Sequence, residues 1–222
     1  MNYSQSIRYR YIYDQFISRF YDIGLKIGLT PFGEKILRLS VFNAISPFIK
    51  HGDRILDVCC GTGTLTLLLT QLFYADCTII GVDLSQGQIA QAQKKNSYPN
   101  LKFTVMDANN LQFKNESFDK IIISAALHEM DKNQRENVLS EIYRILKKEG
   151  KFLIFEHHEP SKMVHRIFYN FYLGFIEKLT SHSSEMQKNI DIELRTAKFK
   201  ILSQHSIKKF LSFFQIILCK KN

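Results

Sequence analysis

The sequence predicts an α/β fold with a doubly wound, mostly parallel sheet and helices on both faces. Three observations lead to this prediction. Short apolar segments rich in β-branched residues alternate with helix-like segments between His51 and Glu156. A glycine-bearing turn, GTG, follows the first of these strands, and an aspartate stands at or just after the carboxyl end of each of the first three. Regular alternation of this kind is typical of a parallel sheet.

The individual elements follow from local composition. We expect five strands, over residues 54–58, 77–83, 101–107, 118–126 and 151–156. The apolar spacing between them predicts helices over residues 64–73, 86–97 and 133–146. Ser85 is a suitable cap for the second helix, and Asp131 or Asn133 for the third.

Size and charge limit the function classes. With 222 residues, 45% of them hydrophobic, the chain is long enough for one domain with a sizeable core. Its net charge of +9 favours nucleic acid or anionic lipid as a neighbour, although it also serves solubility, and both interpretations stay open. We expect a cytoplasmic protein, because the sequence shows neither a secretory leader nor an apolar run long enough to cross a bilayer.

The four cysteines predict neither a disulfide framework nor a metal site. Cys59 and Cys60 are adjacent, which strains any bridge between them. We interpret the pair mainly as small residues that fill a tight turn, with a reactive thiol near a ligand as the alternative.

The turn after the first strand predicts a ligand of a particular charge. Asp57 ends the strand, and Gly61 and Gly63 permit close approach of the backbone. A dinucleotide site would require a third glycine where this chain has Thr66, and its pyrophosphate would be repelled by Asp57. A cationic ligand, S-adenosylmethionine, suits these residues better.

The other two aspartates suit the same ligand. Ligands of such sheets bind beyond the carboxyl ends of the strands, where Asp57, Asp83 and Asp107 would rim one cleft. Asp83 would accept from the ribose hydroxyls, and Asp107 from the adenine amino group. Three independent loop or capping aspartates are the alternative.

Five segments in order resemble the class I S-adenosylmethionine-dependent methyltransferases: LDVCCGTG, GVDLS, VMDANNL, FDKIIISAALHEM and RILKKEGKFLIFE. The resemblance implies a Rossmann-like, seven-stranded sheet in which residues 198–210 and 211–221 form the final strand pair and the last strand is antiparallel. It also implies S-adenosyl-L-homocysteine as the product. The expected cofactor-binding residues are Asp57, Cys59, Gly61, Thr62, Gly63, Asp83, Leu84, Asp107, Ala108 and Ser124.

Within that family the chain is most similar to the small-molecule group that includes the menaquinone and ubiquinone C-methyltransferases. These also begin with a YD-containing helical segment, here Tyr13-Asp14 and Tyr21-Asp22, and carry a cysteine before the GTG turn. The resemblance leaves the methyl acceptor and the acceptor atom open.

The flanking segments are expected to form the substrate side. Residues 1–50 have helical apolar spacing with interspersed arginines, which predicts an N-terminal helical lid or a helix packed on the core. Residues 51–222 would form the methyltransferase core, with a helical substrate-side insertion at about 160–195. The expected lid and substrate contacts are Tyr13, Tyr21, His157, Phe168 and Tyr172.

His128 is the candidate catalytic base. It follows the fourth strand in SAALHEM, where the chain should pass the methyl donor, and a phenol or hydroquinone acceptor would profit from a base there. A capping or packed histidine is the alternative, and Glu129 could take its place. We expect no metal, because EHHE lacks the spacing of zinc-binding helices.

The leading prediction is therefore a methyltransferase that acts on a small lipophilic or aromatic acceptor, such as a quinone precursor. A phospholipid head-group N-methyltransferase in peripheral contact with the inner face of a membrane is the first alternative. A nucleic-acid partner is disfavoured, because the fourth strand ends in SAAL and lacks the NPPY-like motif of base-flipping amino methyltransferases. A cofactor-binding protein without catalysis, and the oligomeric state, also stay open.

Overall fold

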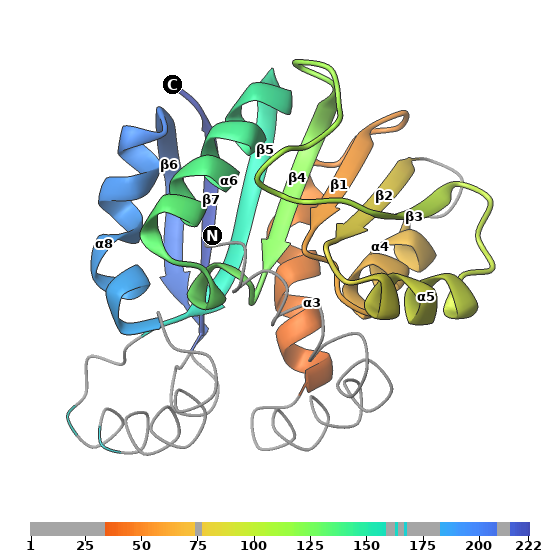
Figure 1. Ribbon diagram of the computed structural model, residues 1–222, viewed down its shortest axis with the longest axis horizontal. Coiled ribbons are helices and arrows are strands. Elements are labelled where there is room, and N and C mark those ends of the chain that lie inside the picture. Colours follow the sequence, from red (N-terminus) through yellow and green to blue (C-terminus); the bar gives the residue numbers. More distant parts are fainter. Residues whose placement is uncertain (1–33, 74–76, 159–162, 164–166, 168–182, 208–213) are drawn as a thin grey trace.

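The computed structural model describes residues 34–73, 77–158, 163, 167, 183–207 and 214–222. Figure 1 shows a central sheet with helices packed around it. In chain order the elements are α3 (Glu34–Ile45), η3 (Ser46–Phe48), β1 (Arg54–Val58), α4 (Thr64–Leu72), β2 (Thr78–Asp83), α5 (Gln86–Lys95), β3 (Leu101–Val105), β4 (Phe118–Ser124), η4 (Leu127–Glu129), α6 (Lys132–Ile145), β5 (Leu146–His157), α8 (Ser183–Thr196), β6 (Phe199–Ser206) and β7 (Phe214–Lys221).

The seven strands form one sheet in the order β3-β2-β1-β4-β5-β7-β6. The first five are parallel, whereas β7 is antiparallel to both β5 and β6. The doubly wound, seven-stranded sheet with an antiparallel last strand is thus confirmed. Because β1 to β5 run the same way, their carboxyl ends share one edge of the sheet, the lower one in Figure 1.

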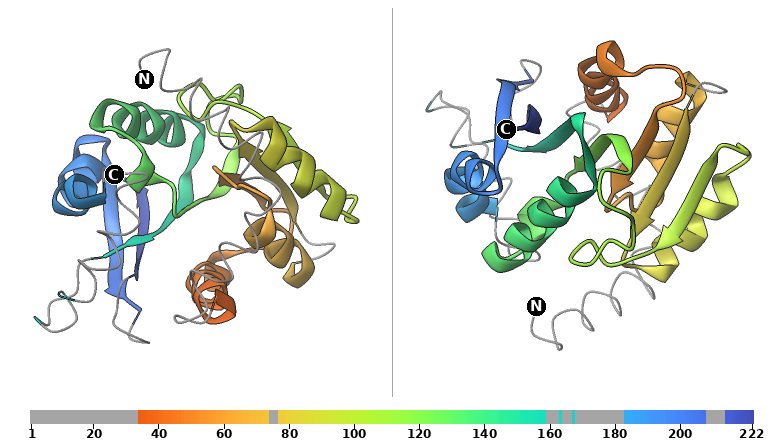
Figure 2. Two further views of the ribbon diagram at one scale, coloured as in Figure 1. Left: turned by 60° about the horizontal axis from the view of Figure 1, so that its bottom comes forward. Right: turned by 90° about the horizontal axis from the view of Figure 1, so that it is seen from above.

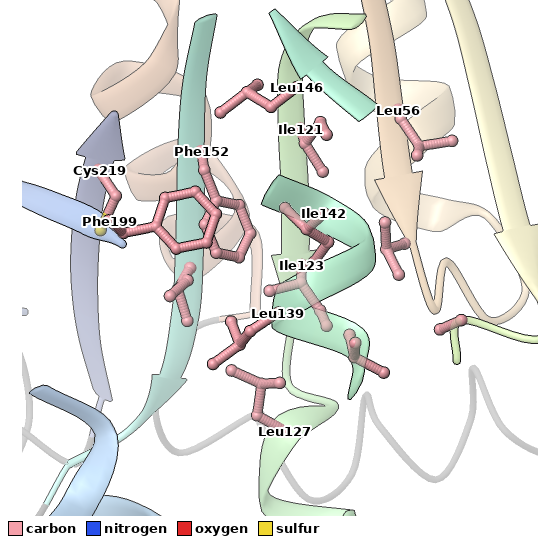
Figure 3. Packing of buried hydrophobic residues seen from close by; sticks show 14 of the residues in the cluster. Leu56, Ile121, Ile123, Leu127, Leu139, Ile142, Leu146, Phe152, Phe199 and Cys219 are labelled. Atoms are coloured by element: carbon pink, nitrogen blue, oxygen red, sulfur yellow. The ribbon is translucent and has the colours of Figure 1, made fainter. Parts of the chain in front are cut away.

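Helices cover both faces of the sheet, as the view from above in Figure 2 shows. On one face, α6 and α8 bury apolar side chains against alternate residues of the central strands, among them Leu56, Ile121 and Phe152 (Figure 3). On the other face, α3, α4 and α5 pack against the intervening residues, such as Ile55 and Ile122. Buried side chains on both faces explain why these strands are almost continuously apolar.

Helix α3 lies within the segment predicted to be a lid. Leu37, Val41 and Ile45 are buried in the core cluster on the α3–α5 face. The described part of residues 1–50 that forms this helix is therefore packed on the core. Tyr13 and Tyr21, the residues predicted to line the lid, lie outside the described residues.

Most predicted element boundaries differ from the observed ones by only a few residues. Helix α5 ends at Lys95, not at residue 97, because the cap residue Asn96 adopts an extended backbone conformation. Helix α6 begins at Lys132, where Asp131 and Gln134 form a capping box. Strand β5 begins at Leu146, five residues earlier than predicted, since Leu146 pairs with Phe118 beyond a register shift.

Buried ion pairs join elements of the described fold, as two examples show. The guanidinium of Arg135 on α6 donates to both carboxylate oxygens of Glu193 on α8, at 2.8 and 2.9 Å, and so joins the two helices. Lys120 on β4 contacts Asp53 at 2.8 Å, at the opposite edge of the sheet from the strand carboxyl ends. Among the described residues, no helix combines the length and apolar character needed to span a bilayer.

Candidate functional site

The turn after β1 depends on left-handed backbone conformations. Cys59, Gly61 and Gly63 have φ values of 58°, 55° and 73°. At Gly63 a side chain is excluded by space as well, because an added Cβ would lie 2.5 Å from the Phe103 ring and 3.0 Å from Cβ of Ala92. Gly63, the second glycine of GTG, therefore lets helix α4 begin close against the face of the sheet.

Asp83, at the end of β2, holds this turn in place. Its Oδ2 accepts the N–H of Gly61 at 2.9 Å, and its Oδ1 accepts the N–H of Ser85 at 2.9 Å. The carboxylate is 6% exposed and lines the cleft described below. Because a carboxylate accepts several hydrogen bonds, a residue of this kind at the cleft is suited to a ligand hydroxyl as well as to the turn.

Asp57 is buried beneath the turn. Its Oδ2 accepts the hydroxyl proton of Thr66 at 2.6 Å, whereas among the described residues no group donates to its buried Oδ1. Burial raises the pKa of Asp57 to about 7, and the Thr66 hydrogen bond and Arg38 oppose this only in part. A nearby cationic group would favour the ionised form of this carboxyl.

A cleft lies at the carboxyl ends of β1, β2 and β3. The space within it, counted together with its open mouth, is about 610 Å³. Its walls are largely apolar, and three carboxylates, Asp83, Asp107 and Glu129, stand among them. The lining residues are Cys59, Asp83, Leu84, Met106, Asp107, Ala108, Asn109, Ala126, Glu129, Met130 and Gln134.

The tandem cysteines differ in position. Cys59 lines the cleft. Cys60 instead lies close to Gly81, since a Cβ added to Gly81 would be only 2.9 Å from the Cys60 sulfur. Burial raises the pKa of both thiols well above the ordinary value, and the carboxylates of Asp57 and Asp83 raise it further. Because a thiolate is the reactive form, these environments disfavour nucleophilic chemistry at either sulfur.

A second polar group lies where β4 and β5 end. Glu156 is 1% exposed, and its Oε2 accepts the backbone N–H groups of Ala126, Leu127 and His128 at 3.1, 2.9 and 3.4 Å. Its Oε1 accepts the N–H of His157 at 2.9 Å and lies 2.8 Å from Nδ1 of His128. The rings of His128 and His157 meet edge to face, with centroids 4.6 Å apart.

The charges of this group are set by its surroundings. Burial raises the pKa of Glu156, but the charge and hydrogen bond of His128 outweigh it and bring the pKa to about 2. Burial lowers the pKa of His157 to about 3, with His128 adding to the effect. At neutral pH, Glu156 is therefore a carboxylate and His157 an uncharged imidazole.

The same three side chains could also be considered as metal ligands. Within the described part of the chain, His128, Glu156 and His157 form a group whose ligand atoms lie within 4.8 Å of one another. Both oxygens of Glu156, however, already accept N–H groups, and a cation would have to displace the Nδ1 hydrogen bond of His128. We therefore interpret the cluster as a hydrogen-bond network.

The structure brings part of the predicted cofactor set together. Five of those residues line the cleft directly: Cys59, Asp83, Leu84, Asp107 and Ala108. Four belong to the strand end and the turn that close it: Asp57, Gly61, Thr62 and Gly63. Ser124 ends β4 and is absent from the lining.

The predicted substrate contacts are only partly described. His157 is buried beside Phe214 and His128, whereas Phe168 and Tyr172 lie outside the described residues. Sequence reasoning missed Glu156 as the partner of His128 and Met106, Met130 and Gln134 as cleft walls. The carboxyl-end rule that selected the aspartates also applies to Glu156, one residue before the end of β5.

Fold and site together define a class of protein. The sheet is Rossmann-like, its glycine turn carries no third glycine, and the site presents carboxylates at a cleft with apolar walls. The buried Oδ1 of Asp57, which lacks a described donor, fits a ligand that brings a cationic donor. These features define a protein that binds an adenosyl cofactor with a positively charged end.

Comparisons with known proteins agree with this class. The family model for the methyltransferase domain matches residues 55–150. A demethylmenaquinone methyltransferase of Lactobacillus johnsonii is 31% identical over 185 residues, which cover 78% of this chain and 73% of the relative. A 2-phytyl-1,4-naphtoquinone methyltransferase of Nostoc is 32% identical over 131 residues, 57% of this chain and 56% of the relative.

A solved structure shares the fold as well. The Haemonchus contortus phosphoethanolamine N-methyltransferase 2, in complex with S-adenosyl-L-methionine, superimposes with a TM-score of 0.68 at 18% identity. The match covers 96% of this chain and 59% of that one. The chain belongs to the class I S-adenosylmethionine-dependent methyltransferases, and S-adenosylmethionine is its cofactor.

Proposed function

We propose that this methyltransferase transfers the methyl group to a reduced quinone precursor, a lipophilic hydroquinone. The main support is the 31% identity over 185 residues to a demethylmenaquinone methyltransferase, together with the match to a naphtoquinone methyltransferase. His128 does not itself line the cleft, but it is a base-type side chain in the segment that carries the cleft residues Ala126 and Glu129, which supports an acceptor that has to lose a proton.

We assign each part of the cofactor to residues of the cleft and of the turn beside it. Asp83, which lines the cleft, would accept hydrogen bonds from the ribose hydroxyls. Met106 and Ala108 would hold the adenine ring, with Asp107 at its amino group. Asp57 would attract the positively charged methionine end through the turn.

The cofactor supplies an electrophilic methyl group on a sulfonium. The protein has to align the acceptor with it and exclude water, which can contribute about 7–11 kcal/mol. His128 would take the hydroxyl proton of the hydroquinone, whose ordinary pKa is about 10 as for other phenols. The resulting phenolate is more nucleophilic at its oxygen and its ring carbons. With the cofactor held at the cleft, its methyl group would pass to that phenolate and S-adenosyl-L-homocysteine would leave uncharged; where a ring carbon is the acceptor atom, its hydrogen would then be lost as a proton to restore the aromatic ring.

A labelled-methyl transfer assay tests the acceptor. Purified protein is incubated with S-adenosylmethionine labelled on its methyl group and with one of three acceptors: a dithionite-reduced 2-prenyl-1,4-naphthoquinone, phosphoethanolamine or total RNA. We expect label in the naphthohydroquinone product only, and a loss of about 10²-fold or more for His128→Asn. Label in phosphoethanolamine or RNA instead would overturn the proposed acceptor.

Calorimetry tests the cofactor site without an acceptor. Asp83→Ala removes a charged hydrogen-bond acceptor, so S-adenosylmethionine affinity should fall at least tenfold. Asp191→Ala removes an exposed carboxylate on α8 and is the matched control, with unchanged affinity. Equal affinities of the two variants would contradict the role of Asp83.

A further inference from the structure

The carboxylate of Glu156 contacts more donors than a single ion pair requires. It receives N–H groups from three consecutive residues, Ala126 to His128, and one from His157, in addition to the ring of His128. The side chain thus connects the end of β5 to the segment after β4. That segment carries the cleft residues Ala126, Glu129 and Met130.

The chemistry of the partners determines where the proton of His128 lies. An ionised carboxylate only accepts hydrogen bonds, so Nδ1 of His128, at 2.8 Å from Glu156, must be the donor. In the neutral ring the lone pair is then on Nε2. His157 is also close to His128, but its ring is uncharged at neutral pH and adds no competing charge.

We propose that Glu156 is a positioning residue that holds His128 in its Nδ1-protonated form and stabilises the imidazolium produced during turnover. The proposal rests on the proposed function of His128 as base. The hydroxyl proton of the acceptor passes to Nε2, the ring becomes positive beside the Glu156 carboxylate, and the proton leaves to solvent after methyl transfer. The carboxylate itself stays ionised throughout.

Glu156→Gln is the informative substitution because a glutamine has only one oxygen. If that oxygen keeps the N–H groups of Ala126, Leu127 and His128, the amide nitrogen faces Nδ1 of His128 and the N–H of His157. Nδ1 must then become the acceptor, which moves the ring proton to Nε2. The variant therefore both removes the charge and reverses the tautomer.

Nitrogen-15 NMR of the histidine rings measures this reversal in the full chain with S-adenosylmethionine bound and no acceptor. The His128 signals are assigned by their loss in His128→Asn. Once the pH is high enough for the ring to be neutral, we expect the Nδ1-H tautomer in the wild type and the Nε2-H tautomer in Glu156→Gln. Glu193→Gln is the matched control, because it alters another buried, paired carboxylate and should leave the His128 signals unchanged.

Kinetics with the reduced 2-prenyl-1,4-naphthoquinone provide the second readout. Glu156→Gln should lower kcat on the order of 10²-fold and change KM little, since the acceptor contacts remain. In a His128→Asn background the same substitution should leave kcat within about twofold, because the two residues act as one unit.

Three outcomes would overturn the proposal: an Nε2-H tautomer in the wild type, an unchanged tautomer in Glu156→Gln, or additive losses of kcat. A carboxylate that only anchors the segment after β4 would produce the last two, together with weaker cofactor binding. A wild type that leaves the naphthohydroquinone unmethylated would refute the proposed acceptor alone, because the NMR comparison needs no acceptor.

Discussion

Gly63→Ala should destabilise the protein mainly through one steric conflict. The added Cβ would lie 2.5 and 2.7 Å from two atoms of the Phe103 ring and 3.0 Å from Cβ of Ala92. Phe103 is buried between β2 and α5 and has little room to move. Forcing a methyl group into such packing costs about 1–3 kcal/mol.

The backbone conformation adds a second cost. At φ +73° an alanine is disfavoured by about 1–2 kcal/mol, and the smaller entropy of the unfolded chain offsets about 0.4–1 kcal/mol of this. Gly63→Ala should therefore lower the free energy of unfolding by about 2–4 kcal/mol. The measurement is equilibrium unfolding in urea, followed by far-UV circular dichroism.

Gly52→Ala is a control with the same backbone cost and no steric one. Gly52 has φ +81°, and its added Cβ would meet nothing within 4 Å, so we expect a loss of only about 1 kcal/mol. Replacing Phe103 by Leu should recover part of the Gly63→Ala deficit. Equal stabilities of the two alanine variants within about 0.5 kcal/mol, or no coupling to Phe103, would refute the reasoning.

Three further predictions concern buried and capping charges. The raised Asp57 pKa of about 7, against an ordinary 3.8, means that the folded state holds this proton more tightly. The free energy of unfolding in urea should therefore fall by on the order of 4 kcal/mol between pH 4 and 7 in the wild type, compared with Asp57→Asn. A difference between the two proteins that does not change with pH would contradict this. Arg135→Met leaves the Glu193 carboxylate buried without its guanidinium partner and should lower the free energy of unfolding in urea by about 3–5 kcal/mol. The double variant Arg135→Met/Glu193→Leu should recover most of this loss. A single variant as stable as the wild type would argue against a stabilising role of the pair. Asp131→Ala removes the cap of α6 and should lower the free energy of unfolding in urea by about 1 kcal/mol, whereas Asp131→Asn should cost less; equal losses would contradict the capping role.

The five parallel strands were predictable because each is a short apolar run with β-branched residues, and the central strands β1 and β4 are buried on both faces. The positions of Asp57, Asp83 and Asp107 followed from the same pattern, since parallel strands bring their carboxyl ends to one edge. The antiparallel final pair was predicted only through the resemblance to a family, because two strands in a tail do not reveal their direction.

The pairing of Glu156 with His128 was not predictable from sequence. The two residues are 28 positions apart, and their contact depends on the register that sets Ser124 of β4 opposite Phe155 of β5. That register includes a shift between Phe118 and Lys120, which local composition does not encode. Side-chain pairs across parallel strands are thus known only once the register is known.

The strand order β3-β2-β1-β4-β5 divides the site between two halves of the sheet. The three aspartates belong to β1, β2 and the segment after β3, whereas His128 belongs to η4, after β4, and Glu156 to β5. The two halves meet in the cleft, because Ala126, Glu129 and Met130 line it together with Asp83 and Asp107. A substitution in the segment after β4 therefore also reaches the cofactor cleft, so that acceptor specificity and cofactor affinity have to evolve together.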